Sequence, residues 1–168
     1  YKGDVLIEGK RIAAIGPSID AADATVIDAS NTVVIPGFVD AHRHSWMAAL
    51  RGLIPNVDIG RYMVQTHRNL AHHYRPDDIH IGNLMTSLGC LEAGITCIVD
   101  NSHNSRTAAH SDAAIRGLVD AGIRAVHASG MPRVDAQWDK QWPKDVDRLR
   151  TQYFASADQL VTLGMYAD

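Results

Sequence analysis

A helix end, a glycine and an apolar strand occur twice in the same order, 28 residues apart. The first copy covers residues 92–100 (EAGITCIVD) and the second covers residues 120–128 (DAGIRAVHA). Glycine is common just after a helix because it adopts the left-handed backbone conformation without steric cost. A repeat of this length is one βα unit, so the pattern favours a parallel α/β array with right-handed crossovers.

Further apolar segments extend this pattern along the chain. We expect parallel neighbouring strands over residues 35–41, 95–100, 123–128 and 160–166, and helices over about 58–73, 107–121 and 144–156. Another helix begins at Pro76, ends before Gly94, and has apolar residues at helical spacing: Ile81, Leu84, Met85, Leu88 and Leu91. A doubly wound open sheet has the same order of elements and remains an alternative, although no GxGxxG loop follows a predicted strand.

The first 35 residues have a different character. Apolar runs at 5–8 and 12–15, joined by residues 9–11, predict a β-hairpin. Runs at 25–28 and 32–35 flank an Ala-Ser-Asn turn and predict a second hairpin. Such strands need partners, because an unpaired sheet edge is a liability for aggregation.

The predicted strand at 35–41 runs directly into His42 and His44. Residues two apart on a strand lie on the same face, so both imidazole rings point the same way. Neutral imidazole is a common ligand of zinc and similar metals. The alternative interpretation is that the two histidines at the strand end have no functional role. The apolar strand before them favours the metal-binding interpretation, because buried parallel strands seldom carry polar residues.

The segment PGFVDAHRH at residues 36–44 resembles the first barrel strand of the amidohydrolase superfamily. The next segment, SWMAALRGL at 45–53, is similar to the branch that contains triazine hydrolases and cytosine, guanine and 8-oxoguanine deaminases. A weaker similarity covers the whole chain, from GDVLIEGKRI at residues 3–12 onward. The 36–44 segment is the specific part of this resemblance.

The resemblance implies an α/β fold of the (β/α)8 TIM-barrel type, preceded by part of a small β-sandwich. Residues 1–34 correspond to the partial sandwich, and residues 35–168 correspond to about the first four βα units. A complete barrel takes about 250 residues, so we expect this chain to be the N-terminal portion of a longer protein. The portion alone is expected to be inactive.

The resemblance also implies that His42 and His44 hold one divalent metal ion, zinc or iron, which makes a hydroxide nucleophile from bound water. The family's further ligands, two histidines and an aspartate, would come from strands beyond Asp168. Binuclear relatives use a lysine at the end of strand four; residues 160–168 contain none, which favours a mononuclear site. The implied reaction is hydrolytic deamination or dehalogenation of a small nitrogen heterocycle. Cyclic-amide hydrolysis and a non-catalytic assembly role remain alternatives.

Active sites of α/β proteins form at the carboxyl ends of the strands. This rule selects residues 100–103, Ser129, Gly130 and residues 166–168. His103 is the candidate substrate contact; its alternative is a loop histidine bonded to solvent. We expect His127 to lie in the core. Trp46 is expected either to line the pocket or to pack in the core, and Arg51 either to bind an anionic group or to form an ion pair. Trp138 and Trp142 are expected to cover an apolar surface.

Composition restricts the class of protein further. The formal net charge is −3 without a basic stripe, so nucleic-acid binding is not expected. No apolar run approaches the ~20 residues of a membrane span, and no signal peptide is visible, although the chain begins at Tyr1. Cys90 and Cys97 fit buried free thiols in the cytoplasm better than one disulfide. We also expect a homo-oligomer.

Overall fold

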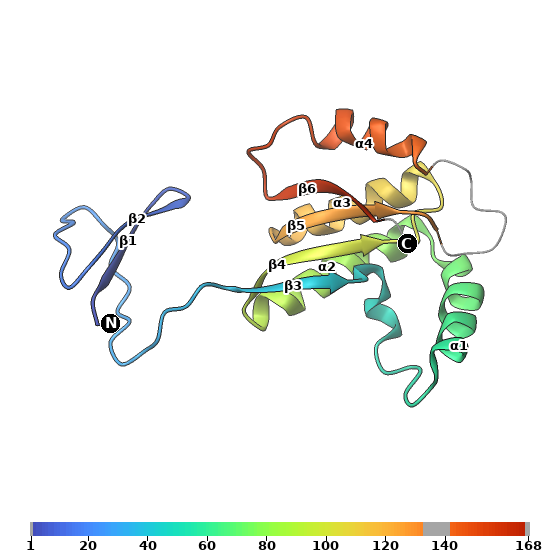
Figure 1. Ribbon diagram of the computed structural model, residues 1–168, viewed down its shortest axis with the longest axis horizontal. Coiled ribbons are helices and arrows are strands. Elements are labelled where there is room, and N and C mark those ends of the chain that lie inside the picture. Colours follow the sequence, from blue (N-terminus) through green and yellow to red (C-terminus); the bar gives the residue numbers. More distant parts are fainter. Residues whose placement is uncertain (1, 133–141, 167–168) are drawn as a thin grey trace. The chain divides into compact units, whose positions relative to one another are not determined.

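The computed structural model describes residues 2–132 and 142–166 (Figure 1). The chain divides into two compact units, Tyr1–Pro36 and Gly37–Asp168. Trp138, Ala167 and Asp168, which the sequence places among the surface and site candidates, lie outside the described residues.

The first unit contains the predicted N-terminal hairpin. Strand β1 (Asp4–Glu8) pairs antiparallel with β2 (Arg11–Gly16), and Gly9 in the turn has a φ of 59°. The prediction of a second hairpin is wrong. Its turn forms, with the Thr32 N–H donating to the Ala29 carbonyl at 3.1 Å, but no strand flanks it. Val26 and Val33 are 84% and 86% exposed, so these runs find no apolar surface among the described residues, and a lone hairpin is marginal in water.

The second unit contains the predicted parallel sheet. Its order is β3 (Phe38–Arg43), β4 (Ile95–Ser102), β5 (Arg124–Gly130) and β6 (Val161–Tyr166), and every neighbouring pair is parallel. The first three strands extend past their predicted ends into polar residues. The apolar pattern therefore locates each strand but misses the polar carboxyl end at which a site can form.

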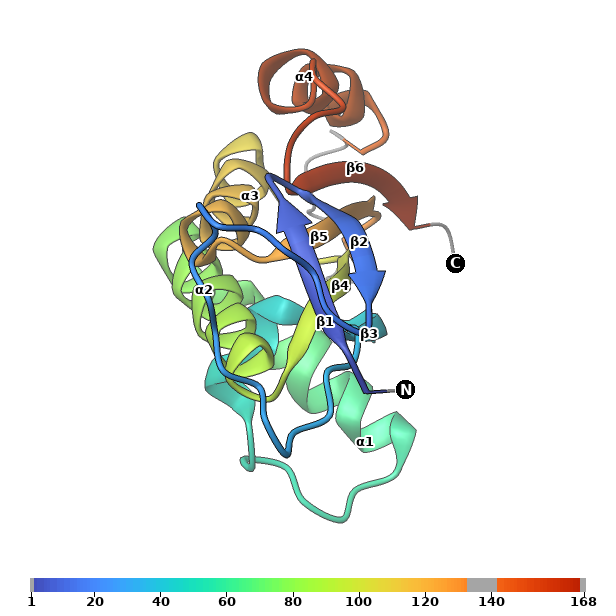
Figure 2. The same ribbon diagram turned by 90° about the vertical axis from the view of Figure 1, so that its left-hand side faces the viewer.

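Helices connect consecutive strands, as the repeat predicts. Helix α2 (Pro76–Glu92) and helix α3 (Ala108–Ala121) lie on the same side of the sheet, and α4 (Lys144–Tyr153) precedes β6 (Figures 1 and 2). Gly94 and Gly122 have φ values of 78° and 68°, which confirms both predicted glycine stops. A core of buried residues joins α2 and α3 to the sheet: Cys90, Ile98, Leu118, Ile123, Ala125 and Val161.

Helix α2 forms where predicted, but it buries a different face. Ile81, Met85 and Leu88 are 45–56% exposed. Its buried residues are instead mostly small or polar: Ile79, Gly82, Asn83, Ser87 and Cys90. Small side chains let α3 and the segment after β3 approach the backbone of α2 closely. Hydrophobic periodicity alone does not detect such a face.

The segment between β3 and α2 is helical but irregular. It contains a 3₁₀ turn η1 (Ser45–Leu50), a short helix α1 (Ile59–Tyr62), a π-helical turn η2 (Met63–Asn69) and a second 3₁₀ turn η3 (Leu70–His73). The segment predicted as a helix over 58–73 is thus helical, but its hydrogen bonds change from α-helical to π-helical to 3₁₀ along the chain. Asp58 begins it by accepting the Arg61 N–H at 2.9 Å, a typical N-cap.

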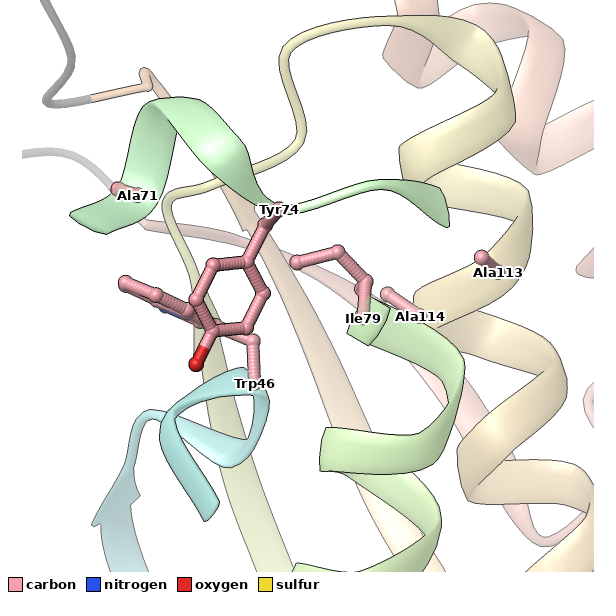
Figure 3. Packing of buried hydrophobic residues seen from close by; sticks show 6 residues of the cluster. All are labelled: Trp46, Ala71, Tyr74, Ile79, Ala113 and Ala114. Atoms are coloured by element: carbon pink, nitrogen blue, oxygen red, sulfur yellow. The ribbon is translucent and has the colours of Figure 1, made fainter. Parts of the chain in front are cut away.

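A second core cluster packs this segment against the helices. Figure 3 shows the Tyr74 ring in front of the Trp46 indole, with Ile79 beside them and Ala113 and Ala114 on α3. The two aromatic rings meet edge to face, with centroids 4.9 Å apart. Both cysteines are free thiols, as expected; Cys90 is buried and Cys97 is partly buried. Among the described residues, no helix has the length and apolar character needed to span a bilayer.

Gly117 sets the distance between α2 and α3. A Cβ atom at this position would lie 2.5 Å from the His80 carbonyl oxygen and 2.8 Å from the Asn83 Cβ. Both neighbours belong to the α2 backbone or to a fully buried side chain, so neither can move cheaply. Gly89 on α2 offers the opposite case, because a Cβ there would meet nothing within 4 Å.

We predict that Gly117→Ala lowers the free energy of unfolding by about 1–3 kcal/mol, because the added methyl group forces the helices apart. Gly89→Ala is the matched control and should raise it by about 0.5–1 kcal/mol, since alanine loses less backbone entropy in a helix. Chemical denaturation of the two variants measures both changes. Equal stabilities would contradict the close packing of α2 on α3.

Candidate functional site

The carboxyl ends of the four strands lie at one edge of the sheet (Figure 1). Arg43, Asp100, His127 and Leu163 are register partners across this edge. The polar residues at the carboxyl ends of β4 and β5 are almost fully buried, with exposures of 1–5%: Asp100, Asn101, Ser102, His103 and Ser129. This concentration of buried polar groups makes the edge the candidate functional site.

A β-bulge in β3 places the two predicted ligands there. Asp40 pairs with Ile98 and Arg43 pairs with Asp100, so three steps on β3 oppose two on β4. An extra residue of this kind reorients the side chains that follow it. Arg43 forms an ion pair with Asp40. His42 and His44, on either side of Arg43, have their Nε2 atoms 3.2 Å apart. The structure thus brings the two histidines together, as their spacing predicts.

A backbone carbonyl determines the tautomer of His44. The ring Nδ1 lies 3.0 Å from the Asn101 carbonyl oxygen, which can only accept, so Nδ1 carries the proton. In the neutral ring, Nε2 then presents its lone pair toward His42. A histidine whose Nδ1–H donates to a carbonyl is the usual arrangement of an Nε2 metal ligand.

The spacing of the two Nε2 atoms suits a shared metal ion. Two nitrogen ligands at the usual zinc distance from a tetrahedral ion lie about 3.3 Å apart, close to the observed 3.2 Å. Within residues 2–132 and 142–166, no group of three or more His, Cys, Asp or Glu side chains is arranged to hold a metal ion. The described part of the chain therefore brings together two side chains that could ligate a metal ion, fewer than a catalytic zinc usually takes.

His103 packs directly against the ligand pair. Its ring centroid lies 4.1 Å from that of His44, and it is 1% exposed. The alternative of a loop histidine bonded to solvent is therefore wrong. On its other sides are the rings of Trp46, at 5.8 Å, and His67, at 4.8 Å. His103 is a buried member of an aromatic cluster behind the metal-ligand candidates.

The sequence did not predict that two further residues, Trp46 and His67, belong to this cluster. Trp46 is 2% exposed and belongs to the core, which decides between its two interpretations. His67 is 2% exposed within the π-helical turn η2, a rare form that is frequent at functional sites. Nothing in the local sequence signals a π-helix, so periodicity assigned His67 only to a helix. Arg51, by contrast, is exposed at the end of η1.

Asp100, the register partner of Arg43, forms hydrogen bonds with three parts of the unit. Its Oδ1 accepts the Ser45 N–H at 3.1 Å. Its Oδ2 accepts the Asn83 amide and the His127 Nδ1–H, each at 3.3 Å. His127 is fully buried, as expected for a core residue, and its partner Asp100 is 1% exposed. The position of Asp100 at a strand end made it a site candidate. The sequence did not show that its carboxylate forms hydrogen bonds inside the protein.

His110 supports the aromatic cluster from α3. Its Nε2–H donates to the Tyr74 carbonyl at 3.0 Å, and the Thr107 hydroxyl lies 2.7 Å from Nδ1. Burial lowers the pKa of His110 below its ordinary 6.5; the bond to Tyr74 opposes this change, and the charge of Arg106 adds to it. The folded protein therefore favours the neutral ring.

This shift predicts a loss of stability in mild acid. Below about pH 6.5 the unfolded chain takes up a proton that the folded chain resists, so the free energy of unfolding falls as the pH falls. We expect wild type to lose more stability than His110→Gln between about pH 7.5 and 5.5. Urea denaturation at both values measures the difference. Equal losses in the two proteins would contradict the assignment.

The chain is similar in sequence to proteins that are named as deaminases. No family model matches it. It is 32% identical over 130 residues to a 5-methylthioadenosine/S-adenosylhomocysteine deaminase of Thermococcus kodakarensis, covering 77% of this chain and 29% of that protein. It is 33% identical over 121 residues to a 5'-deoxyadenosine deaminase of Methanothrix thermoacetophila, covering 69% and 29%. The chain thus spans about three-tenths of the length of these curated relatives.

Solved structures share the fold. A mutant of the atrazine chlorohydrolase TrzN from Arthrobacter aurescens TC1, complexed with zinc and atraton, superposes with a TM-score of 0.79 at 23% identity, covering 97% of this chain and 41% of that one. Guanine deaminase from Bradyrhizobium japonicum superposes with a TM-score of 0.58 at 17% identity, covering 76% and 28%. At these identities the likeness concerns the fold.

Proposed function

Because this chain belongs to the amidohydrolase superfamily, we propose that it forms the N-terminal part of a metal-dependent hydrolase that deaminates or dehalogenates a small nitrogen heterocycle. The observation that carries the proposal is the pair of Nε2 atoms of His42 and His44, 3.2 Å apart at the carboxyl end of β3. The deaminase and chlorohydrolase names of the similar proteins do not favour cyclic-amide hydrolysis or a non-catalytic role.

We extend this proposal to the architecture. The sheet over 35–168 is the first half of a (β/α)8 barrel, and residues 1–34 are part of a β-sandwich. Strands β3 and β6 each have one neighbour in the described sheet. Apolar side chains at this open boundary and on α2 are 45–65% exposed: Phe38, Val39, Ile81, Met85, Leu88 and Met165. Further βα units would cover these side chains, because a closed barrel has no free edges.

His42 and His44 would hold one divalent metal ion through their Nε2 atoms. Zinc is the first candidate, because the TrzN structure contains it, and iron is the second. A catalytic zinc takes about three protein ligands and a water, so we assign the remaining ligands to the part of the larger protein outside residues 1–168. The absence of lysine from residues 160–168 favours a single metal. When bound, the metal lowers the pKa of a water ligand toward about 7.

In this proposal, residues of this chain orient a metal ligand and the substrate, while other groups of the larger protein complete the reaction. Asn101 holds the His44 ring so that its lone pair faces the metal position. His103, packed on His44 at 4.1 Å, is the candidate to orient the heterocycle. In the reaction water adds to a ring carbon, and ammonia or halide leaves. The names of the relatives make 6-aminopurine ribosides the first substrates to test, and that of TrzN makes chlorotriazines the second.

In the full-length protein, we predict that His42→Ala and His44→Ala each abolish both bound metal and hydrolysis, because each change removes a ligand that its neighbour cannot replace. His80→Ala is the matched control, since His80 bonds Asp120 at 2.7 Å on the outer helices. Elemental analysis measures the metal, and turnover is measured on a panel of aminopurines and chlorotriazines. Full activity in the His42 variant would refute the proposed function.

Changing His103 separates substrate orientation from metal binding. We predict that His103→Gln keeps the metal and lowers kcat/KM by about 10²-fold, in the range for an orienting or acid–base group. Because His103 is buried, the melting temperature of the variant is measured alongside its kinetics. A folded, metal-loaded variant with wild-type kcat/KM would show that His103 only packs.

A further inference from the structure

Both polar atoms of the peptide bond that follows His44 are held by hydrogen bonds. The Ser45 N–H donates to Asp100 Oδ1 at 3.1 Å, and the His44 carbonyl accepts the Met47 N–H at 3.1 Å. His44 has φ −111° and ψ 82°, outside regular helix and strand conformation. Since ψ of His44 sets the plane of this peptide, the two bonds determine the direction from which its side chain leaves the backbone.

The next peptide is held as well. The Thr86 hydroxyl donates to the Ser45 carbonyl at 2.8 Å, from the buried side of α2. One turn earlier on α2, a Cβ at Gly82 would lie 2.6 Å from the Trp46 carbonyl oxygen. The glycine therefore lets α2 come close enough for the Thr86 hydroxyl to reach Ser45.

The Asp100 carboxylate is itself held by side chains from α2 and β5. Asn83 on α2 donates to Oδ2 at 3.3 Å and also to the Ala114 carbonyl of α3 at 3.0 Å. His127 on β5 donates to the same Oδ2 at 3.3 Å. The orientation of the carboxylate thus depends on α2, α3 and β5 together. We call Asp100, Asn83, Thr86 and His127 the Ser45 clamp.

Stability alone is a weak reason for such a clamp. Burying a carboxylate and its partners costs free energy that their mutual bonds only about offset, and well-packed apolar residues often do as well. What the clamp provides is a unique backbone geometry. That geometry is located at the residue that follows a candidate metal ligand, and the same strand end supplies Asn101, which holds the His44 ring at 3.0 Å.

We propose that the Ser45 clamp is a positioning group for the metal site, with Asp100 as its centre: it holds the backbone of His44 so that Nε2 meets Nε2 of His42 at ligand spacing. This inference rests on the proposed function, in which both histidines bind the metal. Outer groups that orient metal ligands typically contribute 10–100-fold to metal affinity. The clamp residues lie on α2, β4 and β5, apart from the ligands themselves.

The test uses the full-length protein and measures metal affinity directly. Thr86→Val removes the bond to Ser45 with little change of shape, and Thr86→Ser restores it. Thr151→Val is the matched control, because the Thr151 hydroxyl donates to the Asp147 carbonyl at 3.0 Å within α4. Asp100→Asn tests the centre of the clamp. For each variant, zinc affinity is measured by competition with a chromophoric chelator, the absorption spectrum is recorded with cobalt(II) in the site, and the melting temperature of the metal-free protein is determined.

We expect Thr86→Val and Asp100→Asn to weaken zinc binding by about 10–100-fold and to alter the cobalt(II) spectrum, while Thr86→Ser and Thr151→Val match wild type. Wild-type zinc affinity and spectrum in folded Thr86→Val would overturn the inference, and if Asp100→Asn does not fold, the Thr86 pair decides alone. A wild-type protein that binds neither zinc nor iron, or a His42→Ala variant that binds the metal normally, would instead refute the proposed function, and the inference with it.

Discussion

The buried Asp100 carboxylate joins the parts of the second unit on which the candidate site depends. It accepts hydrogen bonds from the peptide after His44, from α2 and from β5. A carboxylate with 1% exposure is tolerable only where its oxygens are satisfied, so these three elements must meet correctly for the unit to fold. The histidine pair is one consequence of this arrangement, because the end of β3 cannot shift without breaking the bond to Ser45.

Helix α2 shows why this arrangement is hard to predict. Its apolar residues at helical spacing predict a helix correctly, yet Ile81, Met85 and Leu88 are not the face it buries. The packed face contains Gly82, which permits close approach, and Asn83, which forms hydrogen bonds, and neither residue is hydrophobic. Hydrophobic periodicity therefore predicts that α2 is a helix but does not predict which of its faces is buried.

Features that depend on local sequence were predicted, and features that depend on tertiary packing were not. The 28-residue repeat with its two glycine stops, extended by the apolar segments at 35–41 and 160–166, predicted four parallel strands in order, because local propensity and turn chemistry agree there. The spacing of His42 and His44 predicted that both rings lie on the same side of the strand end, where the structure brings their Nε2 atoms together. The depth of His103, the π-helical position of His67 and the inward direction of Asp100 depend on tertiary packing. The second hairpin was predicted wrongly because its apolar runs lack a surface to pack on.

The contact between His42 and His44 has a consequence for how a metal would enter. With the Nδ1–H of His44 donating to the Asn101 carbonyl, Nε2 is the ring atom of His44 that can bind a metal ion, and Nε2 of His42 lies 3.2 Å from it. A metal ion needs the lone pairs of both Nε2 atoms, so both rings would have to be deprotonated at Nε2 when it binds, and binding would depend on pH. The His42 backbone is held by Asp40, whose Oδ1 accepts its N–H at 3.1 Å. Asp40 and the Asn101 carbonyl thus hold the two histidines at the spacing that two nitrogen ligands of one ion need.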